Sequence, residues 1–221
     1  MKIALLVTLA FLLSFSALAL STEQREQLRS VISEVALRSH PEIRNPNLSI
    51  DLYPIENPDY FLESNFHILK RVIFKQKKYR IGVNPKIFQN DITRSALIGV
   101  MAHELTHTED YEQGRLLKVA FVYAFGKKMK KRYERYTDIK VVFKGYAREL
   151  NEYKTWQYKL LSPDALKKKK AQYLTPEEVT FLQQAIEDLN EEKRGQLLKE
   201  LKKKTPLNLK EMKNRVHSFL K

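Results

Sequence analysis

Three side chains that can do chemistry lie within one short segment, His103-Glu104-Leu105-Thr106-His107. Residues four positions apart lie on one face of a helix, so both imidazoles can bind a single Zn²⁺. Glu104 then lies beside the coordination position left open, where a carboxylate can take a proton from water. The pattern predicts metal-assisted hydrolysis with Glu104 as general base. The alternative is a pair of ordinary helical histidines.

A catalytic zinc site of this kind needs a third protein ligand besides the two histidines. The metzincin pattern would require Gly at position 110 and His or Asp at position 113, but the chain has Asp110 and Gln113 there, which excludes that class. Farther along the chain, Glu134 and Asp138 lie four residues apart and so share one face of a predicted helix. These carboxylates are candidates for the third ligand, and a solvated charged face is the other interpretation. If Glu134 is not the ligand, Asp110 and Asp138 are the fallback ligands.

An HExxH segment followed by ExxxD on a later helix resembles the gluzincin peptidases, and among them the small minigluzincins. The resemblance covers roughly residues 79–160. It implies that Glu134 is the third ligand of one zinc ion per chain, and that Asp138 orients His103 or His107 through a ring N–H. The short gap between the two motifs departs from the family pattern, so only a brief connection and one helix fit between them.

The sequence does not identify a single side chain that would stabilise the oxyanion formed during hydrolysis. His67, Tyr136 and Tyr146 are the candidates, and Tyr111 and Tyr153 are equally open. A partly buried strand histidine is the alternative for His67.

Two further histidines, His40 and His217, are expected at the surface, because one precedes a proline at a helix end and the other lies in a basic tail. Tyr146, Tyr153 and Trp156 follow one another at helical spacing, which favours a place in the core.

The residues around these motifs predict an α+β fold. It is a mainly helical, zincin-like domain with a small mixed sheet of about three strands packed on the active-site helix, followed by a C-terminal helical extension. By the same resemblance, strand 66–74 or strand 79–83 is the edge that binds an extended peptide. Gly145 either permits a close approach to the HExxH helix or breaks its own helix. The expected elements are helices 21–39, 92–111, 127–161 and 175–201, and strands 48–53, 66–74 and 79–83.

The first residues predict export. A basic start at Met1-Lys2, an apolar run and a small-residue site at Ala17-Leu18-Ala19 are typical of a signal peptide over residues 1–19. The expected organisation is then a metallopeptidase domain over 20–164 and a basic helical extension over 165–221. The protein is expected to be secreted or periplasmic, without a transmembrane helix once the signal is cleaved. An uncleaved membrane anchor is the alternative.

The charge balance limits the partners. The chain has a formal net charge of +14 and no cysteine, which excludes disulfides and thiol catalysis. Without a recognisable DNA or RNA module, nucleic acid is not an expected partner. A peptide or protein substrate is expected, with an anionic envelope surface as a possible second partner, although runs of lysine also occur on solvated faces. The competing functions are a non-catalytic, basic envelope-binding protein with a structural or absent metal, and a zinc hydrolase of non-peptide amides.

Overall fold

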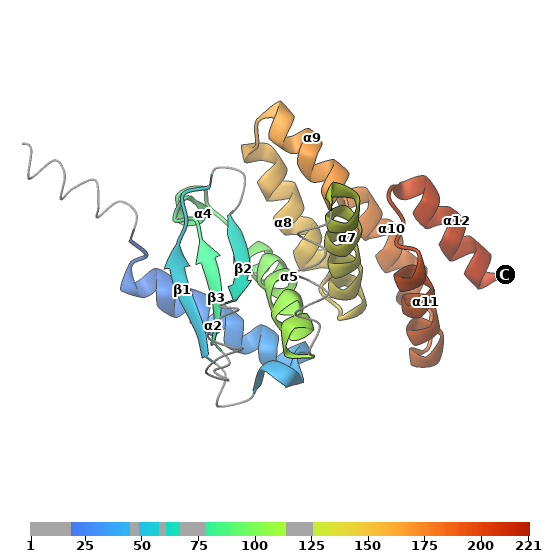
Figure 1. Cartoon of the computed structure of the whole chain (residues 1–221), viewed down its shortest axis with the longest axis horizontal. Helices are drawn as coiled ribbons and strands as arrows, with labels where there is room; N and C mark the ends of the chain where they lie inside the picture. The colour runs from blue at the N-terminus through green and yellow to red at the C-terminus, as the bar shows by residue number, and fades with distance from the viewer. Residues whose placement is uncertain (1–18, 45–48, 58–60, 67–77, 114–125) are drawn as a thin grey trace, which may run out of the picture.

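The structure, a computed structural model, describes residues 19–44, 49–57, 61–66, 78–113 and 126–221. The chain is α+β, as predicted, with a small sheet at one end of the molecule and helices over the rest (Figure 1). Most of the predicted signal peptide lies outside the described residues. In chain order the elements are α2 (Thr22–Ser39), the 3-10 helix η1 (Pro41–Arg44), β1 (Ser49–Pro54), β2 (Leu62–Phe66), β3 (Lys78–Val83), α4 (Lys86–Gln89), α5 (Arg94–Glu112), α7 (Lys127–Phe143), α8 (Ala147–Leu160), α9 (Pro163–Gln172), α10 (Pro176–Glu187), α11 (Glu191–Lys203) and α12 (Leu209–Leu220).

The three described strands form a mixed sheet in the order β1-β3-β2. β1 runs parallel to β3, with Leu52 opposite Ile81, and β2 runs antiparallel to β3, with Ser64 opposite the same residue. The prediction that strand 79–83 could be a peptide-binding edge is wrong, because β3 is the central strand and its two sides are already paired. The other predicted edge, 66–74, lies outside the described residues except for Phe66, the last residue of β2.

Helix α5 carries the HExxH segment through the middle of the molecule. It begins at the N-cap Thr93, whose hydroxyl accepts from the backbone N–H of Ala96. Every residue from Ala96 to Tyr111 is buried, because β2 and α2 pack against α5 as well as α8. A helix that is apolar around most of its circumference is stable only in such an interior position.

Gly99 permits the close contact between α5 and α8. A Cβ atom at this position would lie 2.2 Å from the backbone oxygen of Glu149, a distance that no side chain can occupy. The alternative in which Gly145 provides a close approach to α5 is wrong. Gly145 has φ +87° and no α5 atom within 4 Å of an ideal Cβ, and it lies in the break between α7 and α8. The predicted helix 127–161 is therefore two helices.

The predicted charged helix 175–201 is likewise two helices, α10 and α11. Thr175 caps α10 with a capping box, as predicted, and Asn190 caps α11 through its side chain. The apolar stripe Val179, Leu182 and Ile186 is buried on the rest of the molecule. The division of the chain between residues 164 and 165 stays a prediction.

A buried arginine fastens the C-terminal helices to α7. The guanidinium of Arg135 donates to the backbone oxygens of Pro206 and Tyr173, each at 2.7 Å, and to a carboxylate oxygen of Glu178 at 2.5 Å. Its three partners come from three different segments, so one side chain holds the start of α10 and the segment before α12 in place.

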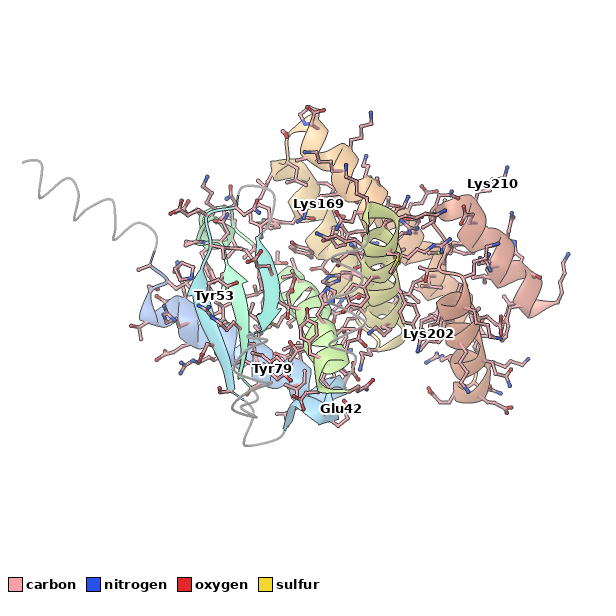
Figure 2. All side chains as sticks on the ribbon, viewed as in Figure 1. Glu42, Tyr53, Tyr79, Lys169, Lys202 and Lys210 are labelled. Atoms are coloured by element: carbon pink, nitrogen blue, oxygen red, sulfur yellow. The ribbon has the colours of Figure 1, made fainter. Side chains whose placement is uncertain are left out.

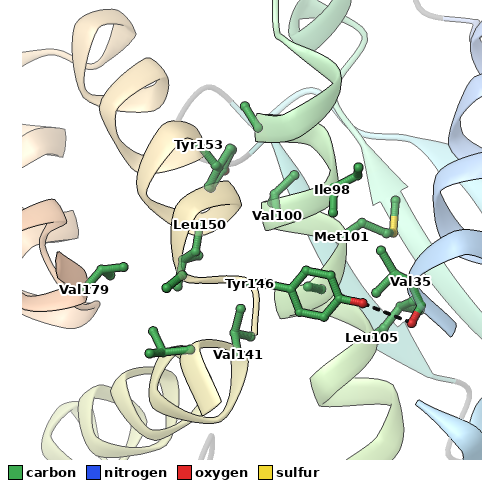
Figure 3. Close-up of a cluster of buried hydrophobic side chains, with 14 of the residues drawn as sticks. Val35, Ile98, Val100, Met101, Leu105, Val141, Tyr146, Leu150, Tyr153 and Val179 are labelled. Atoms are coloured by element: carbon green, nitrogen blue, oxygen red, sulfur yellow. Dashed lines mark hydrogen bonds between the residues drawn. The ribbon is translucent and has the colours of Figure 1, made fainter. Parts of the chain in front are cut away.

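One hydrophobic cluster connects α2, α5, α7, α8 and α10. Figure 3 shows Leu150 and Val179 on one side of it and Met101 and Val35 on the other. Tyr146 points into the cluster, and its hydroxyl lies 3.4 Å from the backbone oxygen of Val35. Within the described residues, no helix is both long and apolar enough to cross a membrane.

Candidate metal centre

The two histidines of α5 point at one another as their spacing predicts. The Nε2 atoms of His103 and His107 lie 3.1 Å apart, and both side chains are almost fully buried. Helix α7 brings Glu134 to the same point, with its Oε2 atom 3.4 Å from Nε2 of His103 and 3.2 Å from Nε2 of His107. Three potential ligand atoms therefore converge from two helices.

These distances suit a tetrahedral zinc ion. With zinc–ligand distances of about 2.0 to 2.1 Å, neighbouring ligand atoms in a tetrahedron lie about 3.3 to 3.4 Å apart. The three edges measured among His103, His107 and Glu134 are 3.1, 3.4 and 3.2 Å. Two imidazoles and one carboxylate also form a donor set that zinc prefers, and a fourth position is left for water or substrate. The residues present therefore fit the metal.

The other ring nitrogen of each histidine is also engaged. Nδ1 of His103 lies 2.9 Å from a carboxylate oxygen of Asp138, and Nδ1 of His107 lies 3.0 Å from the hydroxyl of Tyr133. With the proton on Nδ1 in each ring, Nε2 keeps its lone pair for a metal. Asp138 therefore contacts His103, one of the two histidines that it was predicted to orient. Tyr133 contacts the other one, His107. Tyr133 is not among the residues predicted from the sequence, although it immediately precedes Glu134.

Asp138 is itself held from several sides. Its second carboxylate oxygen accepts from Nζ of Lys154 on α8 and from the backbone N–H of Leu174, each at 2.8 Å. The side chain of Asp138 is completely buried, so these contacts replace its hydration and fix its direction. Lys154 and Leu174 carry no metal-binding signal in sequence, and only the tertiary fold brings them to this carboxylate.

The electrostatics of the site favour a positive charge between the histidines. Burial alone would lower the pKa of His103, but hydrogen bonds to Asp138 and Glu134 outweigh it and raise the pKa to about 10. Burial opposes ionisation of Glu134, yet the two histidines hold the pKa of its carboxyl well below the usual range. Burial likewise opposes ionisation of the Asp138 carboxyl, but Lys154 and His103 outweigh burial and lower the pKa of this carboxyl to about 2. Such a site stabilises a cation, either protons or a metal ion.

Glu104 lies next to this cluster without being part of it. Burial raises the pKa of its carboxyl, against the opposing charges of His103 and His107, and the backbone N–H of Ser64 on β2 donates to it. A carboxylate with a raised pKa and a fixed direction is suited to accepting a proton and passing it on. Figure 2 draws the side chains in the view of Figure 1, in which α5, α7 and α8 occupy the middle of the molecule.

The structure places several predicted site residues away from the cluster. Asp110 is a buried partner of Lys140, with 2.6 Å between carboxylate and ammonium, so this fallback ligand points elsewhere. The prediction of Tyr146 as an oxyanion donor is wrong, since its hydroxyl contacts Ser39 and Val35 in the core. The ring of Tyr136 lies 5.6 Å from Nζ of Lys140, and its role as an oxyanion donor stays a prediction.

Tyr153 and Tyr111, two of the tyrosines considered as oxyanion donors, lie near the site. Tyr153 lines a cavity together with His103 and Glu104, and the charge of Glu104 contributes to the raised pKa of buried Tyr111 after burial itself. The role of His67 stays a prediction, because that residue lies outside the described ones.

His40 is buried, against expectation. Its Nε2 atom lies 3.1 Å from the hydroxyl of Thr106 on α5, and Nδ1 lies 2.9 Å from the hydroxyl of Ser39. Burial, followed by the charge of Lys144, lowers the pKa of His40 to about 3, so the ring is neutral. The proline that follows indicates the end of α2, but it does not reveal that the imidazole of His40 packs inward. The other expected surface histidine, His217, is exposed.

The chain gives no match to a protein-family model, to a curated protein sequence or to a solved structure.

Proposed function

We propose that the chain is an exported zinc-dependent peptidase, in which His103, His107 and Glu134 hold one zinc ion and Glu104 is the general base. The observation that carries this proposal is the convergence of three ligand atoms at edges of 3.1 to 3.4 Å beside a fourth, separately held carboxylate. A structural metal site has no use for that fourth group. The apolar leader in the sequence supports export.

The chemistry divides between the metal and the chain. When bound, zinc supplies a Lewis acid that polarises a carbonyl and lowers the pKa of water. Glu104 takes a proton from the attacking water on its carboxylate and delivers it to the nitrogen of the leaving amine, for which its raised pKa is suited. Asp138 and Tyr133 hold the two imidazoles in the tautomer that binds metal.

Strand β2 supports a peptide as the substrate. It is an outer strand of the described sheet, and the backbone N–H of its residue Ser64 reaches the carboxylate of Glu104. An extended peptide that pairs with an outer strand is held through its main chain, whatever its side chains are. A peptide lying along β2 would therefore have its amide bonds beside Glu104.

The direct test is Glu104→Gln, which keeps the shape of the side chain but cannot accept a proton. We expect this variant to bind zinc as the parent chain does and to lose peptide hydrolysis by about two to four orders of magnitude. Bound zinc is measured by elemental analysis and hydrolysis with a quenched fluorescent peptide library. Glu177→Gln, a change at an exposed position of α10, is the matched control. Hydrolysis at the parental rate in Glu104→Gln would remove the mechanism.

A further inference from the structure

The cavity beside the candidate metal centre is too small for a peptide. It measures about 30 Å³, enough for about two water molecules, and His103 and Glu104 line it on the metal side. Pockets that hold a drug-sized ligand measure about 300 to 1,000 Å³, and a peptide segment is at least as large. The side chains that would hold the metal are all less than one tenth exposed. A peptide can therefore reach Glu104 only if part of the cavity wall moves away.

The wall of the cavity comes from two kinds of element. Leu62 at the start of β2 and Val100 on α5 belong to the large hydrophobic cluster that also connects α2, α7, α8 and α10. Lys169 on α9 and Tyr173 just after α9 also line the cavity, but they lie outside that cluster. The cavity thus lies between β2, along which the peptide is proposed to bind, and α9.

Helix α9 is held only weakly by apolar packing. Among the helices that the structure describes, it is the one that contributes no side chain to the large hydrophobic cluster. Its buried residues are Ala165 and Lys169, a small side chain and an aliphatic stem with a charged end. The neighbouring helix α10, by contrast, buries Val179, Leu182 and Ile186. Elements with few buried apolar contacts open at the lowest cost in free energy, so α9 is the part of the wall that moves most readily.

Both ends of α9 are suited to act as hinges. Ser162 before the helix and Tyr173 after it have extended backbone, with ψ of 157° and 172°. The segment beyond α9 is anchored, because the backbone oxygen of Tyr173 accepts from Arg135 and the backbone N–H of Leu174 donates to Asp138. Helix α9 can therefore move while Leu174 and Asp138 stay in place.

The ring of Tyr173 lies over the metal centre when α9 is in place. Its centre is 5.7 Å from the centre of the His103 ring, and Nζ of Lys169 on α9 lies 5.0 Å from the centre of the same tyrosine ring. Ala165 and Lys169 are four residues apart and so share the face of α9 that is buried on this side. Helix α9 and the ring of Tyr173 thus cover the site together.

We infer that α9 and the ring of Tyr173 form a lid over the candidate metal centre, and that this lid must open before a peptide can bind. The inference rests on the proposed function and adds its regulation, since the closed form is latent. Only the open fraction of the chains binds substrate, so the apparent kcat/KM is proportional to that fraction while opening is rare. A change that weakens α9 raises the activity, and a contact that holds α9 in place lowers it.

Ser162→Ala weakens the lid without touching the site. The hydroxyl of Ser162 accepts from the backbone N–H of Ala165 at 3.3 Å and caps α9. A helix of 10 residues is marginal by itself, so loss of this cap should make opening about fivefold more frequent. Asn190→Ala is the matched control, because the side chain of Asn190 caps α11 in the same way and α11 does not line the cavity.

The first test measures lid opening without metal or substrate. The chain has no cysteine, so Val100→Cys places a single thiol in the cavity wall, where DTNB can reach it only after opening. The reaction should be about fivefold faster when Ser162→Ala is added, and unchanged when Asn190→Ala is added. Val35→Cys, at a buried position of α2, is the control thiol and should not respond to Ser162→Ala. An unchanged rate at position 100, or an equal increase at position 35, would overturn the inference.

The second test uses zinc to separate a lid from a structural support. A lid that opens equally often with and without the metal changes zinc uptake and zinc release by the same factor and leaves Kd unchanged. We expect both rates to be about fivefold higher in Ser162→Ala and parental in Asn190→Ala, measured by stopped flow with a zinc-binding dye. A weaker Kd with an unchanged uptake rate would show that α9 supports the metal centre structurally, and would count against the lid.

The third test is hydrolysis of the quenched fluorescent peptide library. We expect kcat/KM to be about fivefold higher in Ser162→Ala and parental in Asn190→Ala. If Ser162→Ala and the parent chain cleave at the same rate, the lid is wrong although the peptidase stands. If none of the chains cleaves a peptide, the proposed function fails, and thiol labelling at position 100 still decides whether α9 opens over the site.

Discussion

Buried histidines occur at two places on helix α5, and the pKa shifts at the two places have opposite signs. One place is the pair His103 and His107 on α5 itself, and the other is His40, which contacts α5 from the end of α2. His103 and His107 face Glu134 and Asp138, and the pKa of His103 is raised to about 10. His40 packs on the hydroxyl of Thr106, and its pKa is lowered to about 3. Both groups are buried, so burial alone does not distinguish them.

The difference lies in the charges around each imidazole. Carboxylates surround the first group, and the lysines Lys144 and Lys140 lie near the second. A buried histidine among carboxylates gains stability from an added positive charge, whereas one near ammonium groups must stay neutral. We therefore expect the HExxH face of α5 to bind a cation and the His40 face to hold α2 against α5.

The largest expected effect is on the free energy of unfolding, and it comes from the buried pair of Lys140 and Asp110. Lys140→Met removes the ammonium that faces the buried carboxylate of Asp110, which should lower the free energy of unfolding by about 3 to 5 kcal/mol. Adding Asp110→Asn should recover part of that loss. Guanidinium denaturation measures the stability, and bound zinc per folded chain should not change. If Lys140→Met lost zinc but kept its full stability, the structural role assigned to Lys140 and Asp110 would be wrong.

The next effect is a pH dependence carried by His40. Its folded-state pKa of about 3 lies below the ordinary value of 6.5, so the unfolded chain binds the proton more tightly. The stabilisation is complete above about pH 6.5 and is lost as the pH falls towards 3. Between pH 7 and pH 4.5 the parent chain should lose about 2 to 3 kcal/mol more than His40→Gln does.

Denaturation curves at the two pH values measure this difference. His217→Gln, at an exposed position, is the control and should behave as the parent chain does. If parent and His40→Gln lose the same stability on acidification, His40 is not held neutral in the folded state and the contrast between the two groups fails.

A smaller effect is expected from Asp138→Asn. The amide keeps the shape but loses the charge that His103 Nδ1 faces, so zinc affinity should fall about 10- to 100-fold. Competition with a zinc-binding dye measures the affinity. Asp110→Asn, in which the carboxylate lost faces Lys140, should leave zinc affinity unchanged. Equal losses in the two variants would place the third ligand or its support elsewhere.

Local spacing explains why much of the candidate site could be predicted from the sequence. The i, i+4 separation brings His103 onto His107 on any helix, and the same separation places Glu134 and Asp138 on one face of α7. The capping boxes at Ser21 and Thr175 also act within four residues, and both are present. Features set by short-range geometry could be found without the fold.

Features that depend on contacts between distant segments could not be predicted from the sequence. His40 precedes a proline, which indicates a helix end but not the direction in which the imidazole turns. Strand β2 reads Leu-Glu-Ser-Asn-Phe, whose polar centre gives a weak strand signal, and pairing with β3 forms it. Lys154 and Tyr173 reach the site only because α8 and the segment after α9 fold over α5 and α7.

The most direct test of the central claim is the zinc content of three purified chains, measured by elemental analysis. We expect about one zinc per chain in the parent and in His40→Gln, and loss of that zinc in Glu134→Ala. A Glu134→Ala chain that retains the metal, or a parent chain that binds none, would contradict a metal centre built from His103, His107 and Glu134.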